Sequence, residues 1–389
     1  MKTLFKNYII LKNGRNLGVG DIAVDGEYIV EPGLGFAPDR VYDGKGRLYL
    51  SAGLIDIHIH GAGGYDFMDA VPDEYIKIAE CAAEHGTTAL YPTLLCASDG
   101  EMEAAVAVYE QTRESKKGAA MLGLHFEGPF LSPLQSGALD PEYIRKPEPE
   151  IYKKYFAMSD HIARMTVAPE IEGAAELGVY MREHGIIGSI GHTDALFEDC
   201  VRAHDEGGYK LMTHLYSAMS HTRRINAFRH GGAVEAGYYF DDMYVELIAD
   251  GKHLPKEILA LAYKFKRGRI VLVTDAMRAA GTDVEESILG SRRNGQQVFI
   301  EDGVAKMPDR LAFAGSIATA DHLIRTMIDL AGVSVAEAVR MMTETAAEAM
   351  KIPDRGFLEP GMKADIILFD EGINIKATVR DGSFVYGSL

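Results

Sequence analysis

Histidines and acids occur in short clusters along this chain, and apolar runs precede most of the clusters. An apolar run that ends in a polar residue is typical of a buried strand whose last side chain leaves the core. Imidazoles and carboxylates are the groups that bind divalent metals and move protons in hydrolases. Delivered one after another at strand ends, they predict the active site of a metal-dependent barrel hydrolase. The residues are His58, His60, Glu127, His192, His214 and Asp275.

His58 and His60 are separated by one residue after the apolar run Ala52–Ile55. Because side chains alternate along a strand, both imidazoles share one face and can reach one metal. The glycines of Gly61–Gly64 allow the following loop to turn over the site. The alternative is a pair of ordinary surface histidines.

Glu127, His192 and His214 together form a two-histidine, one-carboxylate set, a catalytic zinc pattern that leaves a position for water. Taken singly, Glu127 is also explained as a helix cap or loop ion-pair partner, and each histidine as a hydrogen-bonded structural residue. The donor set suits zinc first, and also iron, manganese or cobalt. Whether one or two divalent metal ions bind each subunit stays open.

Asp275 ends the apolar run Ile270–Val273, where an unpaired acid is costly. Its functional interpretation is a general base that then serves as general acid, and its alternative is a helix N-cap. His253 is expected to polarise or anchor the scissile carbonyl oxygen. The alternative for His253 is a surface loop histidine.

Composition limits the partners. The 389 residues carry a net charge of −17, which argues against nucleic acid or an anionic membrane as a partner. The three cysteines form no C-x-x-C pair, so a reduced, cytoplasmic protein is expected. We expect no signal peptide, because the N-terminus lacks a long apolar segment. No apolar run is long enough to span a membrane.

Both ends of the chain are rich in strand signals, with hairpin turns expected at Asn13-Gly14, Asp25-Gly26 and Asp381-Gly382. The middle alternates strands with helices, which are expected at 72–85, 173–184, 320–330 and 335–350. Repeated strand–helix units predict a parallel sheet, and over this length a closed (β/α)8 TIM barrel. We therefore expect an α/β chain: a barrel at 53–350 and a small β-sandwich domain built from 1–52 and 351–389. No glycine-rich nucleotide motif follows the first strand.

Several longer motifs repeat those of a known group of hydrolases. They are Gly53–Gly61 (GLIDIHIHG), Pro92–Leu94, His125–Pro133 (HFEGPFLSP), Gly191–Thr193, Thr213–Tyr216, Leu272–Ala276 and Gly356–Asp365. In this order and spacing they resemble the amidohydrolase superfamily and, within it, the N-acetylglucosamine-6-phosphate deacetylase family. The resemblance covers nearly the whole chain, and the motifs are specific only when taken together.

The resemblance implies roles for individual residues. Glu127, His192 and His214 would bind the metal, and some members place a second metal near His58 and His60. Asp275 would be the catalytic acid and base, and His253 a substrate contact. Further substrate contacts would be Ala138, Ser217, Ala218, Arg229, Gly251, Phe313, Ala314 and Gly315. Family members usually form homodimers or homotetramers, with phosphate contacts near the subunit interface.

Three departures from the family pattern lie on the substrate side. Leu139 stands where the family usually has histidine, and Ser217 stands where it usually has asparagine. Arg229-His230-Gly231-Gly232 replaces Arg-Glu-Pro-Gly, after an apparent insertion that carries Arg223 and Arg224. The metal and acid positions show no such change.

The first hypothesis is therefore metal-dependent removal of acetyl from N-acetylglucosamine 6-phosphate, with Arg229 holding the phosphate. The basic residues near Arg229 are alternatively a solvated loop. A second hypothesis keeps the chemistry but changes the substrate to N-acetylgalactosamine 6-phosphate, an unphosphorylated N-acyl sugar or another amide. A third is a sugar-phosphate sensor without catalysis, which the intact Asp275 argues against.

Overall fold

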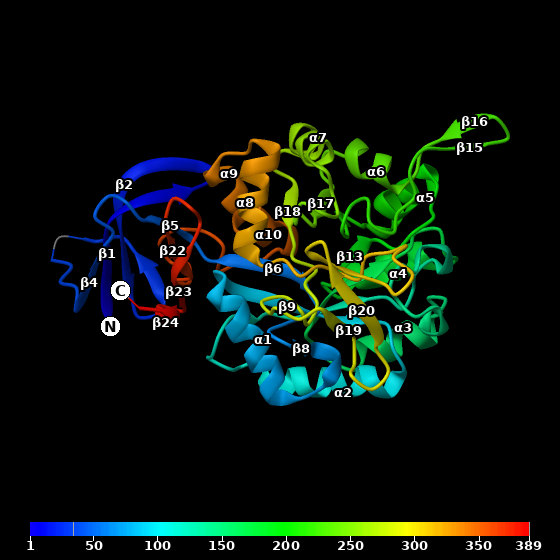
Figure 1. Ribbon diagram of the computed structural model, residues 1–389, viewed down its shortest axis with the longest axis horizontal. Helices are drawn as coiled ribbons and strands as arrows, with labels where there is room; N and C mark the ends of the chain where they lie inside the picture. The colour runs from blue at the N-terminus through cyan, green and yellow to red at the C-terminus, as the bar shows by residue number, and fades with distance from the viewer. Residues whose placement is uncertain (34, 389) are drawn as a thin grey trace.

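The computed structural model describes residues 1–33 and 35–388, and its main body is a barrel of parallel strands with a smaller sheet at one end (Figure 1). The barrel closes because the backbone N–H of Asp275 donates to the carbonyl of His58 at 2.9 Å, beside a parallel bridge between Ile59 and Ala276. The predicted (β/α)8 barrel is thus confirmed. Its strands are β6 (Leu54–Ile59), β9 (Thr87–Leu95), β11 (Leu124–Glu127), β12 (Ile162–Val167), β13 (Ile187–Ile190), β14 (Leu211–Met212), β17 (Tyr244–Leu247) and β18 (Ile270–Leu272), with β10 (Ala120–Met121) paired to β9.

Helices surround the barrel (Figure 1). In the first one, Pro72 lies in the opening turn, where its missing N–H costs no helix hydrogen bond. Tyr75, Ile78 and Ala82 recur at helical spacing and are buried, so this face packs on the strands. The helices are α1 (Pro72–Glu84), α2 (Asp99–Thr112), α3 (Pro149–Phe156), α4 (Ala174–Glu183), α5 (Phe197–Arg202), α6 (Ala233–Tyr239), α7 (Lys256–Lys266), α8 (Ala320–Ala331), α9 (Val335–Arg340) and α10 (Glu344–Met350), with shorter 3₁₀ or π turns at Phe67–Asp69, Pro133–Gln135, Pro141–Tyr143 and Ala203–Gly207.

The expected single helix at 335–350 is wrong, because the structure has α9 and α10 there with a break between them. The carbonyl of Met341 accepts from the N–H of Leu272, and that of Met342 from the N–H of Ile55 at 2.6 Å. These bonds tie the segment to β18 and β6 at the amino end of the barrel. Hydrogen bonding to strands outside the helix therefore ends α9 and lets α10 begin in a new direction.

Both chain ends build one mixed sheet, as the sequence predicts. The turn at Asn13-Gly14 has φ of 52° and 66°, the left-handed conformation that a tight hairpin requires. Phe5, Leu50 and Ile366 come from distant parts of the chain and share one buried core. The strands are β1 (Lys2–Lys12), β2 (Arg15–Asp25), β3 (Tyr28–Val30), β4 (Arg40–Asp43), β5 (Tyr49–Ala52), β22 (Ile366–Phe369), β23 (Ile375–Arg380) and β24 (Ser383–Gly387).

Three smaller strand groups were not expected from the sequence. The hairpin of β15 (Arg223–Ile225) and β16 (Phe228–His230) projects from the barrel beyond α5 (Figure 1). The second group is a three-stranded sheet of β19 (Glu286–Leu289), β20 (Gln296–Glu301) and β21 (Val304–Lys306), and the third pairs β7 (Gly61–Ala62) with β8 (Tyr65–Asp66). Among the described residues, no helix is long and apolar enough to cross a membrane.

Candidate active site

The carboxylate of Glu127 lies at the centre of the site, at the end of β11. Its Oε1 is 3.2 Å from Nε2 of His192 and 3.0 Å from Nε2 of His214. Those two nitrogens are 3.1 Å apart. The three residues are buried and their ligand atoms converge, so they form a group able to hold one metal ion.

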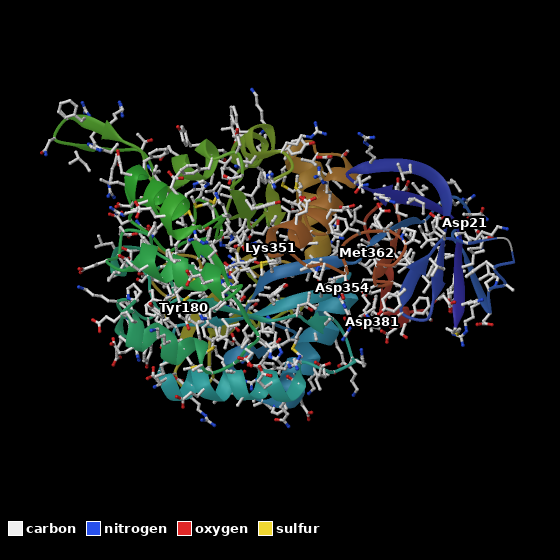
Figure 2. The ribbon with its side chains drawn as sticks, turned by 180° about the vertical axis from the view of Figure 1, so that it is seen from behind. Asp21, Tyr180, Lys351, Asp354, Met362 and Asp381 are labelled. Atoms are coloured by element: carbon white, nitrogen blue, oxygen red, sulfur yellow. The ribbon has the colours of Figure 1, made fainter. Side chains whose placement is uncertain are left out.

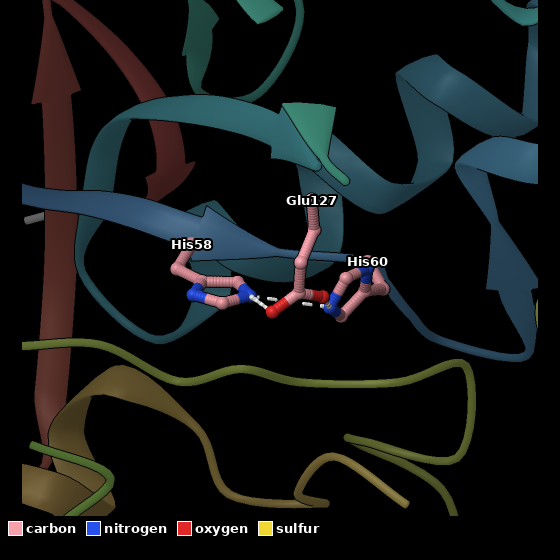
Figure 3. Close-up of side chains that lie close together, drawn as sticks. All are labelled: His58, His60 and Glu127. Atoms are coloured by element: carbon pink, nitrogen blue, oxygen red, sulfur yellow. Dashed lines mark hydrogen bonds and ion pairs between the residues drawn. The ribbon is translucent and has the colours of Figure 1, made fainter. Parts of the chain in front are cut away.

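A second group shares the same carboxylate. Oε2 of Glu127 is 3.2 Å from Nε2 of His60, and Oε1 is 3.4 Å from Nε2 of His58 (Figure 3). The two histidine nitrogens are 3.2 Å apart, as expected for side chains on one face of a strand end. Neither histidine is a surface residue, since their side chains are 0 and 2% exposed.

The hydrogen bonds on the far side of each ring test whether a metal fits. Nδ1 of His60 faces the carbonyl of Thr93 at 3.2 Å, and Nδ1 of His192 faces the carbonyl of Gln135 at 2.9 Å. A carbonyl only accepts, so each Nδ1 carries the hydrogen and each Nε2 of a neutral ring presents a lone pair. Those lone pairs point at each other and at Glu127 oxygens, which are also acceptors. Such a set of acceptors needs either protons or a metal cation between them, and the convergence of the ligand atoms suits a divalent metal.

The pKa values of the site residues also favour a bound cation. Burial raises the pKa of Glu127, but the charge of His58 and hydrogen bonds from His192 and His214 outweigh it and hold the pKa well below its usual value. Burial lowers the pKa of His60, yet hydrogen bonds to Asp275 and Glu127 raise it to about 9. The carboxylates therefore stay ionised and attract either protons or a metal onto the imidazoles.

Asp275 follows β18 and borders the second group. Its Oδ1 is 3.1 Å from Nε2 of His60 and 3.3 Å from Nε2 of His58. No helix begins after it, because the next regular element is β19, so the N-cap interpretation does not hold. Burial raises the pKa of Asp275, but the charge of His58 and the hydrogen bond from His60 lower it overall.

Backbone strain marks three of these strand ends. His192, His214 and Asp275 have φ of 47°, 29° and 45°, in the left-handed region that side chains other than glycine rarely adopt. Such strain persists only where the surrounding structure enforces it, and it clusters at functional sites. Here it accompanies the sharp turn by which each chain leaves its strand at the barrel mouth.

A charged layer beneath the metal groups was missed by the sequence analysis. The buried carboxylate of Glu246, on β17, is 3.2 Å from Nδ1 of His58 and accepts the backbone N–H of His214 at 3.1 Å. Arg164, on β12, pairs with Glu246 and also donates to Thr213 Oγ1 at 2.9 Å. A signal was present, since each is a single charge inside an apolar strand, where it must be paired.

The expected site residues mostly meet at one cavity of 430 Å³ at the carboxyl end of the barrel. Leu139 and Ser217, two of the departures from the family pattern, also line it. Among the residues that the structure describes, no lysine or arginine does. The expected residues on its lining are His60, Glu127, Ala138, His192, His214, Ser217, Ala218, His253, Asp275, Phe313 and Gly315, while His58 lies just behind them.

Three expected substrate contacts lie off this lining. Arg229 is on the exposed β15–β16 hairpin. Gly251 lies in the loop after β17, and Ala314 is fully buried beside Phe313 with its N–H bonded to Ala305.

His253 is held in place by an acid. Its Nδ1 is 2.8 Å from Oδ2 of Asp250, whose other oxygen accepts the backbone N–H of His253 at 2.8 Å. The ring packs edge-on against Phe313, with centroids 4.9 Å apart. Its side chain is only 6% exposed, so it is an oriented wall residue rather than a loose surface histidine.

Comparison with known proteins agrees with this geometry. Residues 49–385 match the amidohydrolase family model. An N-acetylglucosamine-6-phosphate deacetylase of Lysinibacillus sphaericus is 35% identical over 87% of this chain and 86% of its own length. An N-acetylgalactosamine-6-phosphate deacetylase of Escherichia coli O157:H7 is 32% identical over 84% of this chain and 85% of its own length.

A solved structure gives the same result. The crystal structure of N-acetylglucosamine-6-phosphate deacetylase from Pasteurella multocida superposes with a TM-score of 0.90, at 30% identity and over 99% of both chains. The fold, the metal-ligand groups and these likenesses agree, and this chain belongs to the amidohydrolase family and, within it, to the N-acetylglucosamine-6-phosphate deacetylases.

Proposed function

We propose that this chain hydrolyses the acetamide bond of N-acetylglucosamine 6-phosphate, giving acetate and glucosamine 6-phosphate. The observation that carries the proposal is the convergence of Glu127, His192, His214 and Asp275 on one cavity of 430 Å³. A volume of this size accommodates a small sugar phosphate. The names of the similar proteins point to the same substrate class.

Glu127, His192 and His214 would hold one divalent metal ion, zinc first among the candidates, and His58 and His60 would hold a second with Glu127. When bound, such a metal supplies Lewis acidity, which lowers the pKa of water toward about 7 and polarises a carbonyl oxygen. Glu246 orients His58, and the carbonyls of Thr93 and Gln135 orient His60 and His192.

Asp275 would move the proton. Its carboxylate accepts a proton from the attacking water as the water oxygen bonds to the acetyl carbon. The same proton then passes to the sugar nitrogen as the carbon–nitrogen bond breaks. The lowered pKa of Asp275 keeps it ionised and ready to accept that proton. Asp250 accepts a hydrogen bond from Nδ1 of His253 and so orients the ring, which in its doubly protonated form would donate its Nε2–H to the acetyl oxygen.

Phosphate recognition would need residues from outside this cavity. None of the described residues lining it is a lysine or arginine, although the substrate carries a dianion. Arg229 lies on the exposed, projecting β15–β16 hairpin, together with Arg224 (Figure 1). We therefore infer a homodimer or homotetramer in which Arg229 of one subunit reaches the phosphate bound by its neighbour.

A cytoplasmic location is part of the same proposal. The thiols of Cys81, Cys96 and Cys200 are free, which suits a reducing compartment. Burial raises the pKa of the Cys96 thiol to about 12. That thiol is therefore neutral and unreactive, as a packing residue would be.

The test follows both products of the metal-loaded protein, acetate and free amine. Equal amounts of the two are expected, and Asp275→Asn should reduce both rates together while the metal content stays unchanged. A sensor would bind N-acetylglucosamine 6-phosphate without releasing either product. Mixing Asp275→Asn subunits with Arg229→Ala subunits should restore part of the activity, since one subunit of a pair then keeps an intact composite site.

A further inference from the structure

A second cavity lies at the opposite, amino end of the barrel. It has a volume of 340 Å³, and we call it the foot cavity. Lys210 and Arg269 line it immediately before β14 and β18, and Tyr244 lines it at the start of β17. Lys351, at the end of α10, completes one side and lies over the barrel in the rear view (Figure 2). The foot cavity therefore shares no lining residue with the candidate active site.

The foot cavity is basic in an acidic protein. Arg182, Lys210, Arg269 and Lys351 line it against two carboxylates, Asp242 and Glu348, although the whole chain carries a net charge of −17. Lys210 neutralises Asp242 through an ion pair of 2.6 Å. Three cations then face the single remaining carboxylate.

These three cations lack ion-pair partners. Among residues 1–33 and 35–388, no carboxylate lies within 4.0 Å of the charged groups of Arg182, Arg269 or Lys351. Arg182 and Lys351 are exposed and Arg269 is partly buried, so all three can offer their charge to an anion that enters the cavity from solvent. Composition does not explain them, because acids outnumber bases over the whole chain.

Neutral groups hold the two guanidinium groups in place. Arg269 donates to the hydroxyl of Tyr244, and its guanidinium carbon lies 4.6 Å from the centre of that ring. Arg182 donates to the backbone carbonyl of Glu206 at 3.2 Å. Each guanidinium has five N–H donors, so further donors remain for a ligand. The arginines are thus oriented without being neutralised, which suits the recognition of a phosphate.

We propose that the foot cavity binds a small phosphate dianion, either a phosphate monoester or inorganic phosphate. Its volume lies within the range of small-molecule sites. Binding here does not depend on the hydrolysis at the other end of the barrel. If phosphate binding at the foot cavity were disproved, the proposed hydrolysis would be unaffected, and the reverse also holds.

Calorimetric titration of the metal-loaded protein with inorganic phosphate and, separately, with glycerol 3-phosphate tests the site at about 0.15 M salt. The double variant R182Q/K351N removes two of the unpaired cations. Asparagine suits position 351, where φ is 54°. The matched control is K45N/R47Q in the terminal sheet, which removes the same charge and also replaces an exposed lysine at φ 54°.

Wild type and K45N/R47Q should bind at least one probe equally well, and R182Q/K351N should bind it at least tenfold more weakly. The KM for acetate release should be the same in all three proteins. Tighter binding of glycerol 3-phosphate would identify a monoester as the ligand, and tighter binding of phosphate the free ion. The site is overturned if wild type binds neither probe, if R182Q/K351N binds like wild type, or if both double variants lose affinity equally.

Discussion

The floor and the wall of the active-site cavity are built differently. The floor consists of His58, His60, Glu127, His192, His214 and Asp275, which stand at strand ends with side chains 0–9% exposed. The wall comes from loops and includes Leu139, Ser217, His253 and Phe313, with Leu134 and Leu311 at 78 and 87% exposure. Strand ends are fixed by the barrel, whereas loops change without refolding it. We therefore infer that the floor determines the reaction and that the wall determines which amide enters the cavity.

The largest effect should come from the carboxylate shared by both metal groups. Glu127→Gln keeps the shape of the side chain but removes its charge. We expect both groups to lose their metal and kcat/KM to fall by at least about 10³-fold, because a metal stabilises the transition state by several kcal/mol. Metal analysis and acetate release check this, with the exposed Glu172→Gln as control. Full activity in Glu127→Gln would show that the floor works without that charge.

The second-largest effect should come from Glu246, in the charged layer beneath the floor. Glu246→Gln weakens the hold on Nδ1 of His58, and groups that orient a metal ligand contribute about 10- to 100-fold to metal affinity or activity. Competition with a chelator measures the affinity. Circular dichroism checks that the variant is folded, since Arg164 loses its buried partner. A folded Glu246→Gln variant with normal metal affinity would show that Glu246 does not contribute to metal binding.

The affinity of the floor for a metal should depend on pH. For each proton that the metal displaces, the affinity should rise by up to about tenfold per pH unit. The pKa of His60 is raised to about 9, so below that pH the ring is protonated in the metal-free protein and a metal must displace the proton. The affinity of the His58–His60 group should therefore rise with pH and level off near pH 9. Titrations in buffers of different ionisation enthalpy would report the released protons. An affinity independent of pH would contradict the raised pKa.

The phosphate contact should alter KM rather than kcat. Arg229→Ala should raise KM for N-acetylglucosamine 6-phosphate by at least about tenfold, because a hydrogen bond to a charged group contributes roughly 1.5–3 kcal/mol. Hydrolysis of the unphosphorylated sugar should not change. Arg15→Ala, in the terminal sheet, serves as control. An unaltered KM would place the phosphate, if the substrate carries one, away from the hairpin.

The smallest expected effect concerns one wall position. Ser217→Asn introduces the residue usual in the family and should change kcat/KM about two- to tenfold, the size of one neutral hydrogen bond. The ratio between N-acetylglucosamine 6-phosphate and its galacto epimer should shift, while metal content stays constant. Equal changes for both sugars would mean that Ser217 does not distinguish the two epimers.

The convergence of the floor residues could be expected from the sequence, because their positions at strand ends leave local signals. The spacing of His58 and His60 places both on one strand face, and Asp275 ends an apolar run. Glu246 and Arg164 carried a signal too, but their pairing joins β17 to β12, strands far apart in the chain. No local pattern specifies such a partner.

Two features of the fold could not be predicted because they depend on tertiary contacts. The break between α9 and α10 follows from hydrogen bonds to Leu272 and Ile55 on separate strands, which local helical periodicity does not contain. The hairpin that carries Arg229 was visible only as an apparent insertion. Its position away from the cavity depends on how β15 pairs with β16 and projects from the barrel.

The most direct test is the rate of acetate release by the metal-loaded protein from N-acetylglucosamine 6-phosphate, compared with its galacto epimer and with the unphosphorylated sugar. We expect the highest kcat/KM for N-acetylglucosamine 6-phosphate. No release from it, with release from another N-acyl compound, would show that Leu139, Ser217 and the hairpin mark a changed substrate. No release from any of them would contradict the catalytic roles proposed for the floor residues.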